Sequence, residues 1–226
     1  LSRGLGDVYK RQEDYRASGF HVLVVGLGNS SVTPDSLGPR VLNNLQVTRH
    51  LKVQYGDEFW NGRSMPVISG IVPGVMAQTG MESAEILKGI IHETKPNLII
   101  AIDALAARSV KRLGTTIQLT DTGIHPGSGV GNHRHSLTKE SLGIPVMAIG
   151  VPTVVGAAAI VHDTVSAMIA ALSKGMETKG MGDFVGSMSS DEQYDLIREL
   201  LEPEFGPLYV TPPDIDGTVT VCYTHL

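Results

Sequence analysis

VLVVGLGNSSVTPDSLGPR, residues 22–40, carries the strongest indication of architecture in this sequence. Its first four residues are a short β-branched apolar run closed by glycine, which is typical of a buried strand in a parallel sheet. Gly26-Leu27-Gly28-Asn29 then turns the chain, since glycine permits a tight backbone path. The apolar spacing of residues 37–45 predicts a helix, so Asp35 is expected on a loop above the carboxyl end of the strand, where open α/β sheets bind ligands. The alternative is that Asp35 or Ser36 only caps this helix.

Short apolar runs alternate with helical patterns along the rest of the chain. We expect further strands at residues 66–72, 98–102, 115–119 and 144–151, and further helices at residues 81–94, 154–172 and 190–201. The alanine-rich helix at 154–172 should pack on the sheet, whereas residues 49–62 and 174–190 are typical of connections. This alternation predicts a three-layer α/β/α fold with a mainly parallel sheet of about five strands.

The composition is that of an ordinary globular protein. Charged residues make up 18% and hydrophobic residues 42% of the chain, and the formal net charge of -5 argues against general nucleic-acid binding. No apolar run reaches the roughly 18 residues that span a bilayer, so neither nucleic acid nor a membrane is an expected partner. Cys222 is the one cysteine, which fits a reducing cytoplasm and leaves no internal disulfide or cysteine metal site.

Both ends of the sequence look foreign to this domain. Residues 7–12, DVYKRQ, are what GATGTGTATAAGAGACAG encodes, which is the end of a widely used sequencing adapter, and residues 221–226 match its opposite strand with one base changed. We therefore expect residues 1–12 and 217–226 to be adapter-derived tails, and residues 13–216 to be a single α/β domain of a longer protein. A parent contig that continues in natural sequence through both ends would contradict this expectation.

A second acidic residue follows another apolar run. Residues 98–102, LIIAI, form the most apolar expected strand and lead directly into Asp103. Because parallel strands end at the same edge of a sheet, Asp35 and Asp103 are expected to face each other there. Two close carboxyl groups share one proton, with the pKa of one of them raised, so the pair can act as base toward water and acid toward a leaving amine. The alternative is two separate loop or capping aspartates.

Other catalytic motifs are weaker or missing. The Gly26-Leu27-Gly28 start of a dinucleotide fingerprint lacks its third glycine, and no Gly-x-Ser-x-Gly elbow or Walker loop occurs. His133 and His135 are more typical of a solvated polar loop than of a metal site. The glycine-rich loop from Gly123 to Gly131 can approach a ligand closely and offer backbone N–H groups to an oxyanion.

Four longer stretches, in order, closely resemble the spore germination protease family: VVGLGNSSVTPDSLGPR, GIVPGVMAQTG, IIAIDALAARS and DTGIHPGSGVGN. The resemblance extends from about Val22 to Pro212. It implies an atypical aspartic endopeptidase whose catalytic aspartates fall on Asp35 and Asp103. It also implies degradation of small acid-soluble spore proteins at germination, in the forespore or spore core, by a homotetramer that is made as a zymogen and uses no cofactor. Compared with the family, the sequence lacks the N-terminal propeptide region and the C-terminal segment.

A more distant resemblance is to the hydrogenase maturation endopeptidases, which are similar in fold. They too carry a Gly-x-Gly-Asn turn with an acidic residue six positions after the asparagine, as Asp35 follows Asn29 here. This resemblance implies an alternative in which Asp35, Asp103 and His125 are ligands of a metal ion. A third hypothesis is a catalytically silent binding domain that uses the same cleft.

Substrate contacts are expected beside the two aspartates. Arg40 and Arg108 lie five residues beyond Asp35 and Asp103, and an arginine fork fits a carboxylate of an acidic spore protein. Structural ion pairs are the alternative role of these arginines. Gly127 and Gly129 of the glycine-rich loop are the other expected substrate-binding residues.

Overall fold

The computed structural model describes residues 19–56, 58, 66–127, 135–175 and 188–225. Its centre is a six-stranded sheet of β1 (His21–Gly26), β2 (Val67–Ile71), β3 (Leu98–Ala107), β4 (Gln118–Thr120), β5 (Val146–Gly156) and β6 (Tyr209–Val210). The strand order is β2-β1-β3-β5-β4, and β6 pairs with the end of β5. The pairs between β2, β1, β3 and β5 are parallel, whereas β4 and β6 are antiparallel to β5. The predicted mainly parallel α/β sheet is confirmed, with one more strand than expected.

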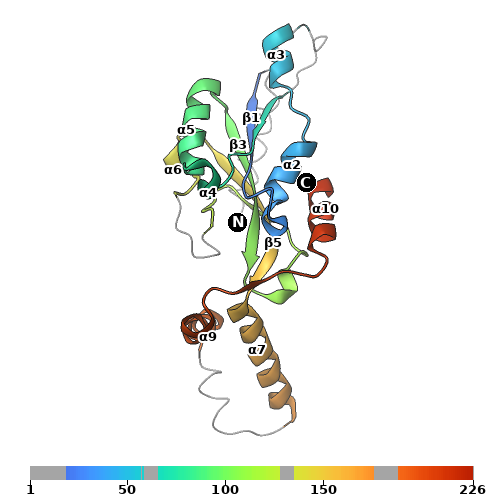
Figure 1. Cartoon of the computed structure of the whole chain (residues 1–226), viewed down its shortest axis with the longest axis vertical. Coiled ribbons are helices and arrows are strands. Elements are labelled where there is room, and N and C mark those ends of the chain that lie inside the picture. The colour runs from blue at the N-terminus through green and yellow to red at the C-terminus, as the bar shows by residue number, and fades with distance from the viewer. Residues whose placement is uncertain (1–18, 57, 59–65, 128–134, 176–187, 226) are drawn as a thin grey trace, which may run out of the picture.

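Helices cover both faces of the sheet, as Figure 1 shows. On one face lie α4 (Met76–Thr79), α5 (Ser83–Thr94) and α6 (Lys139–Leu142), and on the other lie α2 (Leu37–Asn44) and α10 (Ile215–His225). Leu23 packs with Leu87 in the core under α5, and its neighbour Val24 packs with Leu37 in the core under α2. Successive side chains of a strand point to opposite faces of the sheet. The unbroken apolar run of β1 therefore contributes side chains to the core under α5 and to the core under α2.

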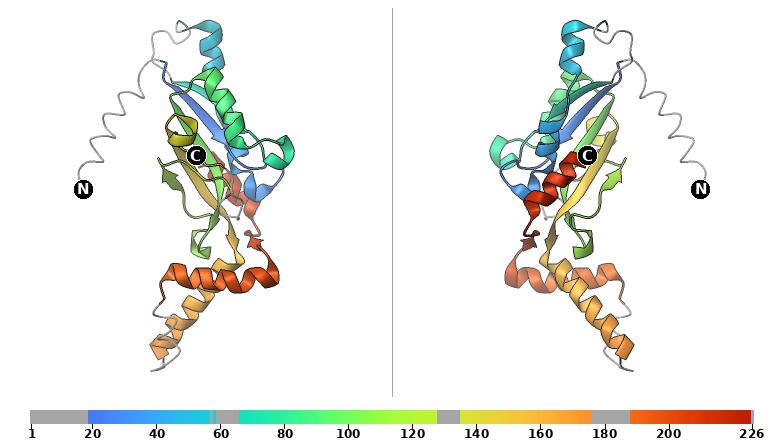
Figure 2. Two further views of the ribbon diagram at one scale, coloured as in Figure 1. Left: turned by 90° about the vertical axis from the view of Figure 1, so that its left-hand side faces the viewer. Right: turned by 90° about the vertical axis from the view of Figure 1, so that its right-hand side faces the viewer.

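Two long helices lie beyond one end of the sheet. Figure 2 shows α7 (Ala157–Gly175) and α9 (Ser190–Phe205) there, packed on each other, while α3 (Arg49–Tyr55) lies at the opposite end. The expectation that the alanine-rich helix packs on the sheet holds only for its first turn. Ala159 is buried against the ends of β3 and β5, but Val161 and Met168 are exposed.

Element boundaries differ from the sequence expectations where pairing extends a strand. β3 continues past Ile102 to Ala107 because its last residues pair with Val151–Val155 of β5. The β-branched Val154 and Val155 therefore belong to β5, and α7 begins only at Ala157. The strand expected at 115–119 is the shifted β4, and the expected connection at 49–62 contains α3.

The C-terminal helix packs on the domain core. Val219 of α10 is fully buried, in one cluster with Leu37 and Val151. The segment 217–225 is therefore folded onto the sheet, and its adapter origin stays a prediction. The expected tail at 1–12 and most of the expected linker at 174–190 lie outside the described residues. In the part of the chain that the structure describes, no helix has the length and apolar character needed to cross a bilayer.

Candidate active site

The loop between β1 and α2 carries Asp35 and is closed by it. Leu27 N–H donates to the carbonyl oxygen of Ile102 at 2.8 Å, which continues the contact between β1 and β3. The short η1 helix (Thr33–Asp35) then returns the chain, and Asn29 N–H donates to the carbonyl oxygen of Asp35 at 3.0 Å and to its Oδ2 at 2.8 Å. No side chain accepts a capping hydrogen bond at the start of α2. Asp35 therefore closes the turn and does not cap the helix.

Two glycines of the same motif allow this loop to lie close to the strands. Gly28 has a φ of +111°, a conformation that favours glycine, and a methyl group there would overlap the carbonyl oxygen of Asp35. At Gly38, in the first turn of α2, a Cβ would lie 2.6 Å from the carbonyl oxygen of Ile102. The tight packing at both glycines brings Asp35 to the edge of the sheet.

Asp103 lies within β3 and not after it. It pairs with Gly150 of β5, and only 7% of the residue is exposed. Its Oδ1 accepts a hydrogen bond from the N–H of Ala104 at 3.0 Å. The last β1 residue paired with β3 is Gly26, opposite Ile102, so Asp103 is the first β3 residue beyond that pairing.

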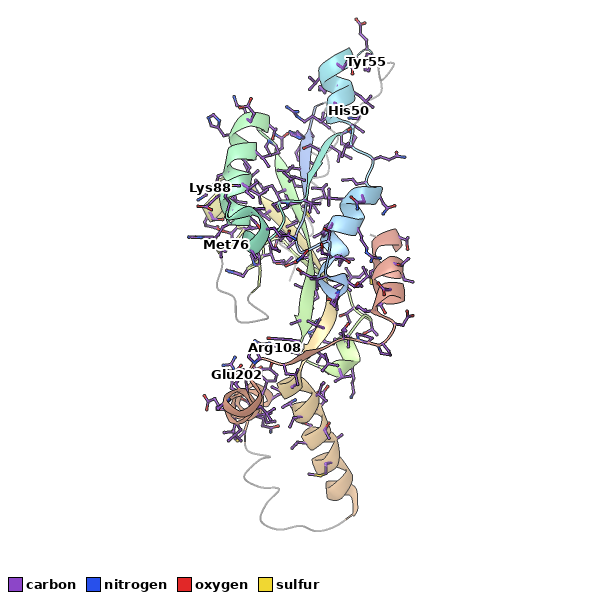
Figure 3. The ribbon with its side chains drawn as sticks, in the orientation of Figure 1. His50, Tyr55, Met76, Lys88, Arg108 and Glu202 are labelled. Carbon is purple, nitrogen blue, oxygen red and sulfur yellow. The ribbon has the colours of Figure 1, made fainter. Side chains whose placement is uncertain are left out.

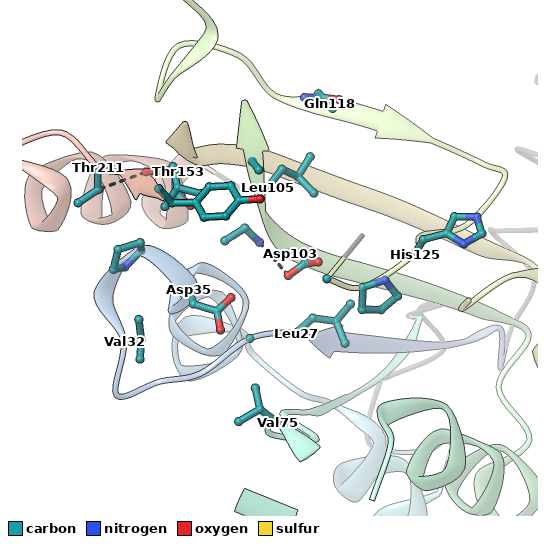
Figure 4. Close-up of a pocket in the computed structure, with 18 of the residues that line it drawn as sticks. Leu27, Val32, Asp35, Val75, Asp103, Leu105, Gln118, His125, Thr153 and Thr211 are labelled. Carbon is teal, nitrogen blue, oxygen red and sulfur yellow. Dashed lines mark hydrogen bonds between the residues drawn. The ribbon is translucent and has the colours of Figure 1, made fainter. Parts of the chain in front are cut away.

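Both carboxyl groups line a cavity of about 620 Å³ at this edge of the sheet. Figure 4 shows Asp35, from the loop before α2, and Asp103, from β3, in the middle of this cavity. Three more of the residues singled out from the sequence also line it, namely Arg108, His125 and Gly127. The fold thus brings together residues that are far apart in the sequence.

The two arginines have different surroundings. Arg108 lies at the end of β3 near α9, as Figure 3 shows, and its exposed guanidinium is 3.4 Å from a carboxylate oxygen of Asp191. Arg40 is not part of the cavity lining and lies 3.6 Å from a carboxylate oxygen of Asp216 in α10. Gly129 lies outside the described residues. Of the two arginines, only Arg108 can reach a molecule in this cavity from its present position.

A metal site would need several ligands gathered in one place. Within the described ranges, no group of three or more histidine, cysteine, aspartate or glutamate side chains is arranged to hold a metal ion. His125 lines the same cavity as the two aspartates without forming such a group. The described residues therefore offer no ready set of ligands for the metal alternative.

Part of the cavity comes from a segment that sequence reasoning missed. Tyr209 of β6 and Thr211 line it, and the Thr211 hydroxyl donates to the carbonyl oxygen of Thr153 at 3.2 Å. Burial, and then the nearby Tyr194, raise the pKa of Tyr209, so its phenol stays a hydrogen-bond donor at neutral pH. β6 has only two residues, and a Gly-Pro pair precedes it closely, so no periodic pattern could reveal it.

The fold and the cavity together define an α/β protein with two acidic side chains at the carboxyl edge of a mainly parallel sheet. The family model described as germination protease matches residues 12–183. The chain therefore belongs to the germination protease family.

Curated relatives agree with this assignment. The germination protease of Caldanaerobacter subterraneus subsp. tengcongensis is 54% identical over 201 residues, which cover 87% of this chain and 60% of the relative. The germination protease of Bacillus subtilis is 43% identical over 228 residues, covering 87% of this chain and 61% of the relative. The chain thus spans about 60% of the length of the curated relatives that it matches.

Solved structures show a more distant likeness. The hydrogenase maturation protease HycI from Thermococcus kodakarensis is 21% identical, with a TM-score of 0.37, over 63% of this chain and 80% of that chain. The hydrogenase maturating endopeptidase HybD from E. coli is 16% identical, with a TM-score of 0.34, over 68% of this chain and 93% of that chain.

Proposed function

We propose that the full-length protein is an endopeptidase that starts the degradation of small acid-soluble spore proteins at germination. Membership of the germination protease family supports this function. The observation that carries the site assignment is the position of Asp35, in the loop that follows β1, and of Asp103, in β3, because both residues line one cavity. We assign the catalytic roles to these two residues.

The two carboxyl groups supply the proton transfers that peptide hydrolysis needs. One of them is ionised, takes a proton from the attacking water and later gives that proton to the leaving amine. The other is protonated and donates a hydrogen bond to the carbonyl oxygen, on which negative charge develops. The groups act as a unit because two neighbouring carboxylates cannot both ionise easily. The buried position of Asp103 keeps bulk water from competing with the substrate for these hydrogen bonds.

The remaining cavity residues bind the substrate. Gly127 lies in the cavity wall, and the glycine-rich loop of which it is part supplies backbone N–H groups to the oxyanion. Arg108 binds an acidic side chain of the substrate in place of its exposed contact with Asp191. No metal ion or other cofactor takes part.

Assembly and processing follow from the family resemblance. The protein acts as a homotetramer in the spore core and is made as a zymogen whose N-terminal propeptide is removed. The exposed apolar side chains of Met168, Leu196 and Leu200 on α7 and α9 support a contact with another chain or with the rest of this protein. Light scattering of the full-length protein tests the assembly, and a monomer at all concentrations would contradict it.

The function is tested by incubating the full-length protein with an acid-soluble spore protein. We expect cleavage by the wild type, also after treatment with a strong chelator, and a rate about 10²–10⁴-fold lower for Asp35→Asn or Asp103→Asn. The control is Asp121→Asn, which changes an exposed aspartate outside the cavity lining and should leave cleavage unchanged. Loss of all wild-type activity in chelator, restored by one metal ion, would contradict the aspartate mechanism and favour the metal alternative.

A further inference from the structure

The strand that carries Asp103 is longer than its neighbour on one side. β1 pairs with β3 up to the contact between Gly26 and Ile102, and Leu27 N–H adds one more hydrogen bond to the Ile102 carbonyl oxygen. From Asp103 to Ala107, β3 pairs with β5 alone. Among the described residues, no other strand pairs with this part of β3, so its edge on the β1 side is open.

Every second residue along β3 directs its backbone N–H and C=O groups to the open edge. In a paired parallel strand, successive residues direct their N–H and C=O groups to opposite sides. Ile102 directs its carbonyl to the β1 side, so Ala104 and Ala106 direct theirs to the same side. The register between β3 and β5 shifts after Leu105, where β5 has one extra residue, Thr153. Because the extra residue is in β5, the alternation of backbone groups along β3 is kept. An unpaired row of this kind is a template for an added strand.

This edge is also part of the cavity wall. Ala104, Leu105 and Ala106 line the cavity that contains both carboxyl groups, and all three are half-buried. The N–H of Ala104 is already bonded to Oδ1 of Asp103, which leaves the carbonyl oxygens of Ala104 and Ala106 and the N–H of Ala106 as the groups for a ligand. A ligand that satisfies such groups along a strand is an extended peptide.

We infer that the substrate peptide binds as an added strand on the open edge of β3, with its scissile bond at Asp103 and one flank running toward Ala107. The inference rests on the proposed peptidase function and adds the mode of substrate binding. Backbone hydrogen bonds supply affinity that does not depend on the substrate sequence, and the side chains beside the edge supply selectivity.

The position of Arg108 then fixes a substrate preference. Arg108 follows β3 directly, five residues after Asp103, which is roughly 16 Å along an extended strand. Because an extended substrate has the same rise per residue, its acidic side chain should lie about five positions from the scissile bond. A peptide with glutamate at this position should be cleaved with a higher kcat/KM than the same peptide with glutamine there. Arg108→Gln should remove this difference between the two peptides.

The test uses the full-length enzyme and an acidic peptide that reaches from the scissile bond to Arg108. A set of peptides carries one N-methylated amide each, at successive positions along this flank. Two positions, two residues apart, donate to the carbonyl oxygens of Ala104 and Ala106, so methylation there should lower kcat/KM about tenfold each. The amide between them points away from the edge, so its methylation should have little effect. The peptide that is methylated at the middle amide is the control. It shows how much the methyl group alone changes the peptide conformation, without the loss of a hydrogen bond to β3.

A substitution in the enzyme tests the same edge of β3. Ala106→Pro removes an N–H that faces the open side and keeps the β5 hydrogen bonds, which neighbouring residues make. It should raise KM with little change in kcat, and it should raise KM more than Ala106→Val does, because valine keeps the N–H. If Ala106→Pro does not fold, the peptide series decides alone.

The outcomes separate this inference from the function itself. An effect of methylation at alternate positions supports the added strand. Cleavage of the unmodified peptide with equal effects at all methylated positions would overturn the binding mode and leave the peptidase function standing. No cleavage of the unmodified peptide or of the spore protein would overturn both.

Discussion

Replacing Gly28 by alanine tests how the loop between β1 and α2 positions Asp35. The backbone at Gly28 has a φ of +111°, which for alanine costs about 1–2 kcal/mol. The added methyl group would also overlap the carbonyl oxygen of Asp35 and lie 3.0 Å from its Oδ1. The loop must move to relieve this overlap, and the movement breaks the hydrogen bonds from Asn29 N–H to Asp35, which costs about 1–3 kcal/mol more because one acceptor is a carboxylate.

Gly80→Ala is the matched control for this change. Gly80 has a φ of +71°, and a methyl group there has no atom within 4 Å, so only the conformational cost of about 1–2 kcal/mol applies. Gly28→Ala should therefore unfold at a urea midpoint lower than that of Gly80→Ala by roughly 1 M, for a urea dependence of about 1–3 kcal/mol per M.

The activity of the full-length protein should separate the two variants further. A displacement of Asp35 by about 1 Å lowers kcat about 10²-fold, while Gly80→Ala keeps the wild-type value. Equal urea midpoints and equal kcat values for the two variants would refute the reasoning about this loop.

Three further predictions follow from single residues. Arg108→Gln should raise KM for an acidic substrate while Arg40→Gln, outside the cavity, leaves KM unchanged, and steady-state kinetics of both variants measure this. Burial lowers the pKa of His21, so the unfolded chain binds a proton at a higher pH than the folded chain does. The free energy of unfolding should then fall as the pH drops below about 6.5, and urea unfolding should show a weaker pH dependence in His21→Gln than in the wild type. Gly89→Ala in α5 adds a methyl group with no atom within 4 Å and should raise the free energy of unfolding by about 0.5–1 kcal/mol, whereas a loss would show that the helix needs glycine there.

The sequence was sufficient for the central strands and for the helices that cover them. The apolar runs at 22–25 and 98–102 lie in β1 and β3, and the helical pattern at 81–94 matches α5 closely, because these segments have strong local periodicity. The end of β3 could not be read in the same way. Ala104–Ala107 is as typical of a helix as of a strand, and pairing with β5 decides between them.

In the candidate site, too, some features can be predicted from the sequence and others cannot. The carboxyl-edge rule places Asp35 and Asp103 together, since it depends only on where parallel strands end. The spacing of Arg40 predicts a substrate contact but carries no information about the direction of its side chain. In the structure the Arg40 guanidinium lies 3.6 Å from a carboxylate oxygen of Asp216 in α10. β6 contributes Tyr209 through a pairing of only two residues, which has no signal in the sequence.

A double-mutant cycle on the two aspartates tests the shared role of the carboxyl groups most directly. Asp35→Asn, Asp103→Asn and the double variant of the full-length protein are compared in kcat on one spore-protein substrate, with urea unfolding as the check that each variant is folded. We predict that each single change lowers kcat by about 10²–10⁴-fold, and that the double change costs little more than either single change, because the carboxyl groups act as one unit. Losses that multiply, or a single variant that keeps substantial activity, would contradict the account.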